Sequence, residues 1–248
     1  MKSIIINADD CGKSVHVDKC IEEGIVLGNI SSTTIMANMD DFDGAVRLYN
    51  QYSNQVSFGW HINLDEGEPL TNSQLLLDKG FFIEKNGRVE LNGTAFTKSF
   101  LNKEMRLEIK KELKSQWEKL RDNGISITHA DSHHFYHTQP CMVQVLPSLF
   151  HELGINRCRN VGNYGAKGLS GIARRSWSLY YKLRGMKMPE TFCSFLGYYK
   201  NPQLKQGETI ELMCHPGHQN SDYIIEFELI KNTNLLDWDA KLITFKDI

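Results

Sequence analysis

Residues 2–12 read KSIIINADDCG, and the expected fold follows from this stretch. Its β-branched start predicts a buried strand over residues 2–8. Ser14 then predicts the N-cap of a helix that ends near Leu27, with Gly28 as its stop. A buried strand followed at once by a helix is the repeating unit of a parallel α/β sheet.

The same alternation continues along the chain. Strands are expected at residues 31–37 and 56–62, with a helix between them at 40–52. Further helices are expected at 101–122, 141–153, 169–184 and 222–231, and further strands at 125–130, 155–160, 191–198, 209–214 and 240–245. With no internal repeat and no clear linker, residues 1–248 are expected to form a single domain, an irregular TIM-like (β/α) barrel.

Residues 63–97 break this rhythm. They contain EGEP at 66–69 and an Asn-Gly pair at 86–87 between two short apolar runs, which predicts a small hairpin in a long loop. A loop of this length inside a compact domain is more often functional than idle. We therefore expect this insertion, which follows the third strand, to cap the site and to help select its substrate.

Composition excludes several classes of protein. The formal net charge is −2 and 41% of residues are hydrophobic, which gives no electrostatic case for binding nucleic acid or an anionic membrane. No apolar run approaches the length of a membrane span. The apolar start is too short for a signal peptide, and the six cysteines form no CxxC pair. A cytoplasmic protein with reduced thiols is expected.

Four of the nine histidines fall within residues 129–137, in the run HADSHHFYH. Imidazole is a frequent metal ligand and the usual proton carrier near neutral pH. A cluster that mixes histidine with aspartate therefore indicates a metal site. The alternative is a polar loop whose histidines serve separate minor roles.

Candidate site residues from distant parts of the chain all follow predicted strands. Asp9 and Asp10 follow the first strand, His61 ends the third, and His215 follows a late one. Residues 131–137 follow another strand. Because the carboxyl ends of parallel strands meet at one rim, these side chains are expected to converge there.

Each candidate also has a structural explanation. Neighbours on an extended chain point apart, so Asp9 and Asp10 should have different tasks, or one of them caps a turn. A lone histidine in an apolar strand, as at His61, is often a core residue. His215 could be a general acid, a substrate contact or a turn residue, whereas His218 is expected at the surface.

Two arginines alternate along the strand expected at 155–160. One of Arg157 and Arg159 should face the rim, where a guanidinium suits a carboxylate partner or a substrate oxygen. A structural ion pair explains the position equally well. The chain contains no P-loop, Rossmann glycine pattern, GxSxG or HExxH motif.

Four motifs occur in chain order: NADDxG at 7–12, GxHxNL at 59–64 with EGxPL at 66–70, THxDSH at 128–133 and LMCHP at 212–216. This set resembles the YdjC-like carbohydrate deacetylases, which include the chitooligosaccharide deacetylases. The motifs lie between residues 4 and 218, nearly the whole chain, and as a set they are highly specific.

The resemblance implies a TIM-like barrel with one divalent metal that hydrolyses N-acetyl groups on amino sugars. It maps the metal ligands onto Asp10, His61 and His133, the catalytic carboxylate onto Asp9, and the late histidine, taken as the proton donor to the leaving amine, onto His215. Family precedent favours Mg²⁺, while two histidines and one aspartate also suit Zn²⁺.

Substrate contacts are expected at Asn63, His137 and Arg159. The expected partner is a small acetylated sugar, and a homodimer stays open. Two residues depart from the motifs: Phe135 stands where the family often has a histidine, and Cys11 replaces a usual phenylalanine. The pocket therefore differs from its relatives' at Phe135, or that histidine is not an essential ligand.

Two other functions are compatible with these residues. A non-catalytic sugar-binding or regulatory barrel could keep the metal site and lack turnover, although every mapped acid, base and ligand is present. A metal-dependent hydrolase of another bond, such as a phosphoester, would need a basic phosphate cradle, which the sequence lacks.

Overall fold

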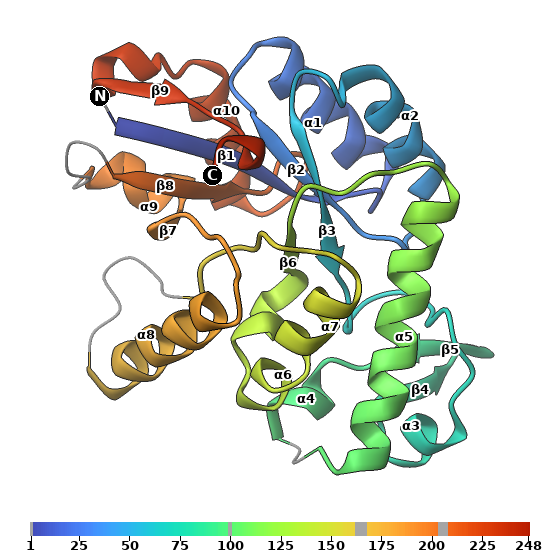
Figure 1. The fold of residues 1–248 in the computed structure, drawn as a ribbon. Coiled ribbons are helices and arrows are strands. Elements are labelled where there is room, and N and C mark those ends of the chain that lie inside the picture. Colours follow the sequence, from blue (N-terminus) through green and yellow to red (C-terminus); the bar gives the residue numbers. More distant parts are fainter. Residues whose placement is uncertain (1, 99–100, 162–167, 203–207) are drawn as a thin grey trace.

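Seven parallel strands form the central sheet of the computed structural model, which describes residues 2–98, 101–161, 168–202 and 208–248 (Figure 1). Six of them lie in the order β6-β3-β2-β1-β8-β7, and β9 pairs with the start of β1. They are β1 (Lys2–Cys11), β2 (Ser32–Ile35), β3 (Ser57–Ile62), β6 (Ala130–Ser132), β7 (Thr191–Ser194), β8 (Thr209–Cys214) and β9 (Ala240–Leu242).

The central strand β1 is buried from Ile4 to its end, as its β-branched sequence predicts. It pairs with β2 on one side and β8 on the other. The register to β2 shifts between Ala8 and Cys11, and Asp10 has a φ of 69°. This irregular strand end turns the two neighbouring carboxylates in different directions.

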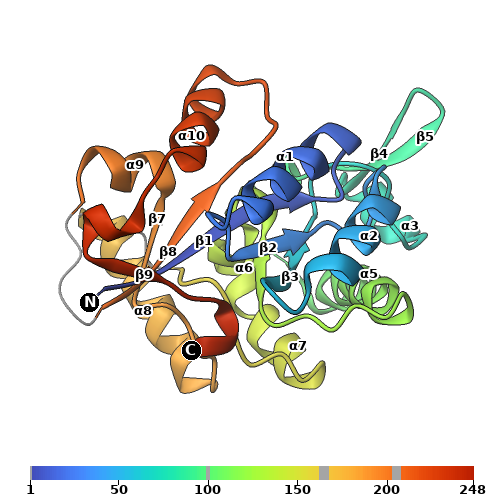
Figure 2. The same ribbon diagram turned by 90° about the horizontal axis from the view of Figure 1, so that it is seen from above.

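Helices surround the curved sheet in both views (Figures 1 and 2). The predicted start of α1 is confirmed, because the Ser14 side chain accepts a hydrogen bond from the Val17 N–H and Gly28 has the positive φ that ends the helix. The described helices are α1 (Val15–Val26), α2 (Phe42–Tyr52), α3 (Gln74–Asp78), α4 (Thr94–Lys98), α5 (Lys103–Asp122), α6 (Pro140–Val143), α7 (Leu146–Glu152), α8 (Gly168–Leu183), α9 (Phe195–Lys200) and α10 (Ser221–Lys231).

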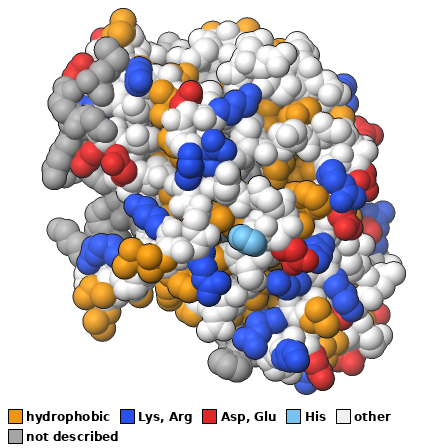
Figure 3. All heavy atoms as spheres, viewed as in Figure 1, with side chains coloured by type: hydrophobic (Ala, Val, Ile, Leu, Met, Phe, Trp, Pro, Cys, Tyr) orange, Lys and Arg blue, Asp and Glu red, His pale blue; other side chains and the backbone are white. Residues whose placement is uncertain are grey.

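Charged side chains of both signs cover the side of the molecule formed by α5. On the face shown in Figure 3, blue and red groups are interspersed over this region. Ion pairs such as Lys114 with Glu152 and Lys111 with Glu108 account for part of the pattern. Among the described residues, no helix is long and apolar enough to cross a membrane.

A regular (β/α)8 barrel is not formed by the described residues. The parallel α/β class is confirmed, but residues 155–160, predicted as a strand, make only isolated bridges, which join Ala130 to Cys158 and Arg157 to Lys187. The Asn160 side chain donates to the backbone carbonyls of Pro189 and Glu190, both at 2.9 Å. Isolated backbone bridges and the Asn160 side chain thus link β6 to the segment before β7, in place of a regular strand.

The insertion carries the predicted hairpin. Strands β4 (Phe82–Lys85) and β5 (Arg88–Leu91) are antiparallel, and the two turn residues Asn86 and Gly87 both have positive φ, as a two-residue turn requires. Phe81, at its base, is buried in the core. The tip projects away from the rest of the molecule (Figure 2).

Several sequence predictions of elements were wrong in extent. Of the strand expected at 125–130 only Ala130 is in a strand, as the first residue of β6, and the strand expected at 191–198 stops at Ser194, whose side chain caps α9. The helix expected at 141–153 is divided into α6 and α7, and Pro147 lies at the start of α7.

Candidate active site

A cavity of about 200 Å³ opens at the carboxyl ends of the strands. Its walls come from the ends of β1, β3, β6 and β8 and from the segments that follow them. The lining residues are Asp9, Asp10, Lys13, His61, Glu66, Ser132, His133, His134, Phe135, Met213, His215, His218 and Tyr223. The convergence predicted from strand ends is therefore found.

Asp10, His61 and His133 form a compact group of potential metal ligands. One ligand atom from each lies within 4.8 Å of the others. Asp10 Oδ1 is 3.1 Å from His61 Nε2 and 2.8 Å from His133 Nδ1. Both Asp10 oxygens and His61 Nε2 are buried, yet these contacts lack hydrogen-bond geometry, so no described residue satisfies the three atoms. Buried donor atoms left in this way, of the types that bind divalent metals, fit a cation.

The state of the Asp10 carboxyl agrees with this reading. Burial raises its pKa, but the imidazoles of His133, His218 and His61 lower it well below its usual value. The carboxylate is therefore ionised at neutral pH and available as a ligand.

His218, predicted at the surface, belongs to this group instead. Its side chain is only 19% exposed, and Nε2 lies 2.9 Å from Asp10 Oδ2. The turn at Gly217, with a φ of 79°, carries the chain back toward the site. The spacing of the two histidines in HPGH, on either side of a turn, is the sequence signal that could have indicated it.

Asp131 orients the His61 ring through Nδ1, the nitrogen that does not face Asp10. Its Oδ1 lies 2.6 Å from His61 Nδ1, and its Oδ2 accepts a hydrogen bond of 3.1 Å from the Thr34 hydroxyl. An imidazole that donates one N–H to a carboxylate turns its other nitrogen toward a metal. Burial lowers the pKa of His61, but Asp131 and Asp10 bring it to about 10 in the metal-free protein.

Asp9 is held by Arg159 rather than by the group around Asp10. The guanidinium contacts both Asp9 oxygens, at 2.8 and 2.6 Å, and the Asn7 side chain donates a third hydrogen bond of 2.8 Å. Burial raises the pKa of Asp9, but the charge of Arg159 brings it to about 2. Asp9 is ionised at neutral pH and lines the cavity.

The prediction that Arg159 binds substrate is not supported by its position. Its side chain is fully buried, lies outside the described cavity lining and pairs with three carboxylates, those of Asp9, Asp131 and Glu211. Glu211, on β8, was not singled out by the sequence. Burial raises the pKa of its carboxyl to about 7, against the opposing charge of Arg159.

His215 faces the cavity with an unsatisfied nitrogen. Its Nδ1 is buried and without a hydrogen-bond partner among the described residues, while its backbone N–H donates to Glu226 at 3.0 Å. Its ring lies 4.4 Å from the Tyr223 ring, centroid to centroid. Burial lowers the pKa of His215 to about 4, so the imidazole is neutral at neutral pH.

Asn63 and His137, both expected to contact substrate, are absent from the described cavity lining. The Asn63 side chain donates to Asn38 and to the Glu66 carbonyl and accepts two backbone N–H groups, so it shapes the start of the insertion. His137 is buried, with Nδ1 2.6 Å from the Ser132 hydroxyl. Their hydrogen bonds give both residues structural positions.

Sequence reasoning also missed Lys13 and Glu66. Glu66 Oε1 lies 3.2 Å from His133 Nε2, and its Oε2 lies 2.6 Å from Lys13 Nζ. The His133 contact, with help from Lys13, lowers the pKa of Glu66 to about 2. The insertion thus reaches the cavity through Glu66, whereas its hairpin contributes none of the described lining residues.

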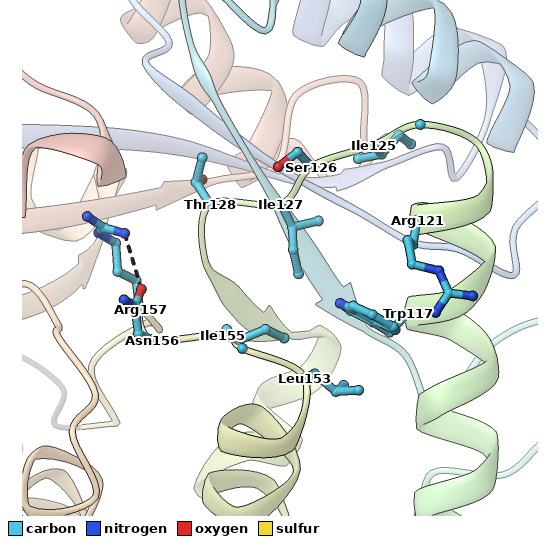
Figure 4. Close-up of a pocket in the computed structure, with 12 residues that line it drawn as sticks. Trp117, Arg121, Ile125, Ser126, Ile127, Thr128, Leu153, Ile155, Asn156 and Arg157 are labelled. Atoms are coloured by element: carbon cyan, nitrogen blue, oxygen red, sulfur yellow. Dashed lines mark hydrogen bonds between the residues drawn. The ribbon is translucent and has the colours of Figure 1, made fainter.

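A larger cavity, of about 570 Å³, lies at the opposite end of the sheet (Figure 4). Trp117 and Arg121 from the end of α5 line it, together with residues 124–128 and 153–157. Its described lining holds no carboxylate and no imidazole. It therefore has no groups for acid–base or metal chemistry, and the smaller cavity is the candidate site.

Comparison with known proteins agrees with the motifs. The profile of the family described as YdjC-like protein matches residues 3–241. This chain belongs to the YdjC-like family. A carbohydrate deacetylase of Clostridium beijerinckii is 29% identical over 263 residues, which cover 99% of each protein. Carbohydrate deacetylase 1 of Listeria innocua serovar 6a is 34% identical over 165 residues, 66% of this chain and 64% of that protein.

A solved structure has the same fold as this YdjC-like chain. It is that of a protein from Enterococcus faecalis V583 provisionally named a cellobiose-phosphate cleavage protein. The TM-score is 0.78 at 18% identity, with 99% of this chain and 98% of that one covered. At this identity the likeness concerns the fold alone, and it agrees with the parallel α/β sheet described above.

Proposed function

We propose that this chain is a metal-dependent hydrolase that removes N-acetyl groups from acetylated amino sugars or from short oligosaccharides such as chitooligosaccharides. The family and the names of the relatives support a carbohydrate deacetylase. The observation that carries the proposal is the convergence of Asp10, His61 and His133 in one cavity with Asp9 and His215.

Asp10, His61 and His133 would hold the divalent cation, with His218 beside them. When bound, such a cation polarises an acyl carbonyl and lowers the pKa of a water molecule. Family precedent favours Mg²⁺, but a donor set rich in imidazole is better suited to Zn²⁺. Both ions therefore enter the test.

Asp9 is proposed as the base. The water oxygen attacks the acetyl carbonyl carbon, and Asp9 accepts the proton that the water loses. Because Arg159 keeps Asp9 ionised, its carboxylate is in the required state across the neutral range. Its low pKa makes it a weak base, so we assign it the orientation of the water as well as proton uptake.

His215 is proposed to hydrogen-bond the leaving nitrogen. When the C–N bond breaks, the leaving nitrogen needs a proton, and the acetyl group with the added water oxygen becomes acetate. A neutral imidazole is a poor donor by itself. Since His215 Nδ1 is unpartnered in the cavity that Asp9 also lines, we propose that it passes on the proton that Asp9 has taken up.

Acetate release gives the test. The purified protein is incubated with acetylated monosaccharides and with chitooligosaccharides of increasing length, after chelation and after return of Mg²⁺ or Zn²⁺. We expect release that chelator abolishes and metal restores, and none from Asp10→Asn. Sugar binding without release would favour the non-catalytic barrel, and phosphate release from sugar phosphates would favour the phosphoester hydrolase.

A further inference from the structure

Phe135 occupies the wall of the catalytic cavity in a backbone conformation that bulky residues avoid. Its φ and ψ are 59° and 31°, and those of the preceding His134 are 47° and 27°. Both lie in the left-handed region, where a side chain crowds its own backbone. Two such residues in succession persist only where the surrounding structure holds them, and strain of this kind concentrates at functional sites.

The turn is held on both sides of Phe135. His133 contacts Asp10 and Glu66, and Asp65 pairs with the His134 ring. On the other side, the Thr138 hydroxyl donates to the Phe135 carbonyl at 2.9 Å. The contacts that place His133 in the metal group therefore also fix the position of Phe135.

The Phe135 ring packs against another aromatic ring but is not fully covered. It meets the Phe192 ring edge-on at 5.9 Å between centroids, and the Arg159 guanidinium lies over Phe192 at 4.8 Å. Phe135 is only partly buried and lines the cavity. A residue needed only to fill the core would be fully buried, so the exposed part of this cavity-lining ring is available to a ligand.

The cavity otherwise presents mainly charged and hydrogen-bonding groups. Among its described lining residues, Phe135 and Met213 offer side-chain surface without oxygen or nitrogen. A pyranose ring has C–H groups on its faces and hydroxyls at its edge, so an aromatic wall opposite polar groups matches its two kinds of surface.

We propose that Phe135 is a specificity-determining residue: its ring receives the face of the sugar that carries the acetamido group and holds that group at the catalytic centre. This inference rests on the proposed deacetylase function. It also accounts for the departure from the motif at this position, since an aromatic ring here contacts carbon where a histidine would offer a nitrogen.

Four variants separate the ring from the backbone strain. Phe135→Ala removes the ring. Phe135→Asn removes it as well but suits the left-handed conformation, which asparagine tolerates. Phe135→Tyr keeps the ring. Tyr199→Ala removes an aromatic side chain that is 42% exposed and outside the described cavity lining, and serves as the control.

Steady-state acetate release and ligand binding are measured together. KM for the best acetylated sugar is expected to rise about tenfold in the Ala and Asn variants, with kcat within about threefold, which is the size of an aromatic contact. Titration of N-acetylglucosamine into the inactive Asp9→Asn background should show the same loss of affinity. The Tyr variant and the Tyr199→Ala control should match the unchanged protein, and metal content should stay constant in all of them.

Other results would overturn the inference. Unchanged KM and affinity in the Ala and Asn variants would show that the ring does not touch the sugar. Recovery in the Asn variant, or loss of metal in both, would assign Phe135 a purely structural role. If the unchanged protein releases acetate and the Phe135 variants have the same kinetic constants, this inference alone is rejected. If the unchanged protein neither releases acetate nor binds the sugar, the proposed function is rejected as well.

Discussion

Arg159 holds the carboxylate of Asp9 at both oxygens, through hydrogen bonds of 2.8 and 2.6 Å. The same guanidinium lies 2.8 Å from Asp131, which in turn orients His61. One buried cation thus fixes the proposed base relative to a proposed metal ligand. Asp10 adds a further buried carboxylate, and Arg159 alone does not balance these charges. In the metal-free protein the protonated His61 imidazole compensates part of the remainder, and a bound divalent cation would take over that role.

Arg159→Lys tests this arrangement. Lysine keeps the positive charge but cannot form two parallel bonds to one carboxylate, so Asp9 loses its fixed orientation. We expect kcat to fall by about 10²-fold, the scale of a misplaced catalytic group. Steady-state kinetics and metal analysis of the purified variant provide the check.

Arg157→Lys is the matched control for that experiment. Arg157 lies two residues away and donates to the Ile248 carbonyl at the far end of the sheet. The Arg157→Lys variant should retain normal turnover. Equal losses in the two variants, or near-normal activity in Arg159→Lys, would remove the argument that the guanidinium positions Asp9.

Asp9→Asn and Asp10→Asn should fail in different ways. Asp9 is proposed to work on the water, and loss of a positioned base typically costs about 10²–10⁴-fold in rate while the metal stays bound. Asp10 contacts the ligand atoms of both His61 and His133, so its variant should lose metal as well. Acetate release and metal content are measured on the same samples. Metal loss from Asp9→Asn alone would reverse the two assignments.

His218→Ala should weaken metal binding. Its Nε2 lies 2.9 Å from Asp10 Oδ2, and groups that support a metal ligand typically contribute about 10–100-fold in affinity. Competition with a chelator of known affinity measures the change. His151→Ala, which removes an exposed imidazole on α7, should leave the affinity unchanged. If the two variants have the same affinity for the metal, His218 does not contribute to metal binding.

The strand ends were predictable because apolar runs mark buried strands and the carboxyl ends of parallel strands meet. That argument placed Asp10, His61 and His215 at one rim, and the cavity contains all three. It could not place His218. The turn before His218 packs so closely on α1 that a Cβ on Gly217 would lie 2.8 Å from the Val17 Cα, and such contacts between distant segments leave no local pattern.

The insertion illustrates the same limit. Its hairpin was predictable from the Asn-Gly pair, a local signal for a tight turn. Which part of the insertion reaches the cavity depends on Asn63, whose side chain folds the following residues back on themselves and brings Glu66 beside His133. Side-chain hydrogen bonds of this kind follow no periodicity, so the sequence indicated a functional loop without its contact residue.

Asp18 lies outside the cavity but supports the loop that carries Asp10. Its Oδ1 accepts the Gly12 N–H at 2.7 Å. Its Oδ2 and the Oδ2 of Asp41 are buried and have no hydrogen-bond partner among the described residues. Both oxygens lie beside Gly44, so closely that a Cβ at Gly44 would overlap them. Burial, reinforced by the charge of Asp41, raises the pKa of Asp18 to about 7.

Asp18→Asn should therefore change how stability depends on pH. In the unfolded chain an aspartate titrates near pH 4, so between about pH 4 and pH 7 the folded protein binds more protons at this position. The stability that Asp18 contributes falls as pH rises through this window and is lowest above it. Asparagine keeps the acceptor for Gly12, offers an N–H to Asp41 and does not titrate.

Urea unfolding at several pH values provides the check. From pH 4.5 to pH 8 the free energy of unfolding of Asp18→Asn should rise relative to that of the unchanged protein. The control Asp43→Asn, at an exposed neighbouring position, should show a constant difference from the unchanged protein. A constant difference for Asp18→Asn across this range would exclude a raised pKa at this residue.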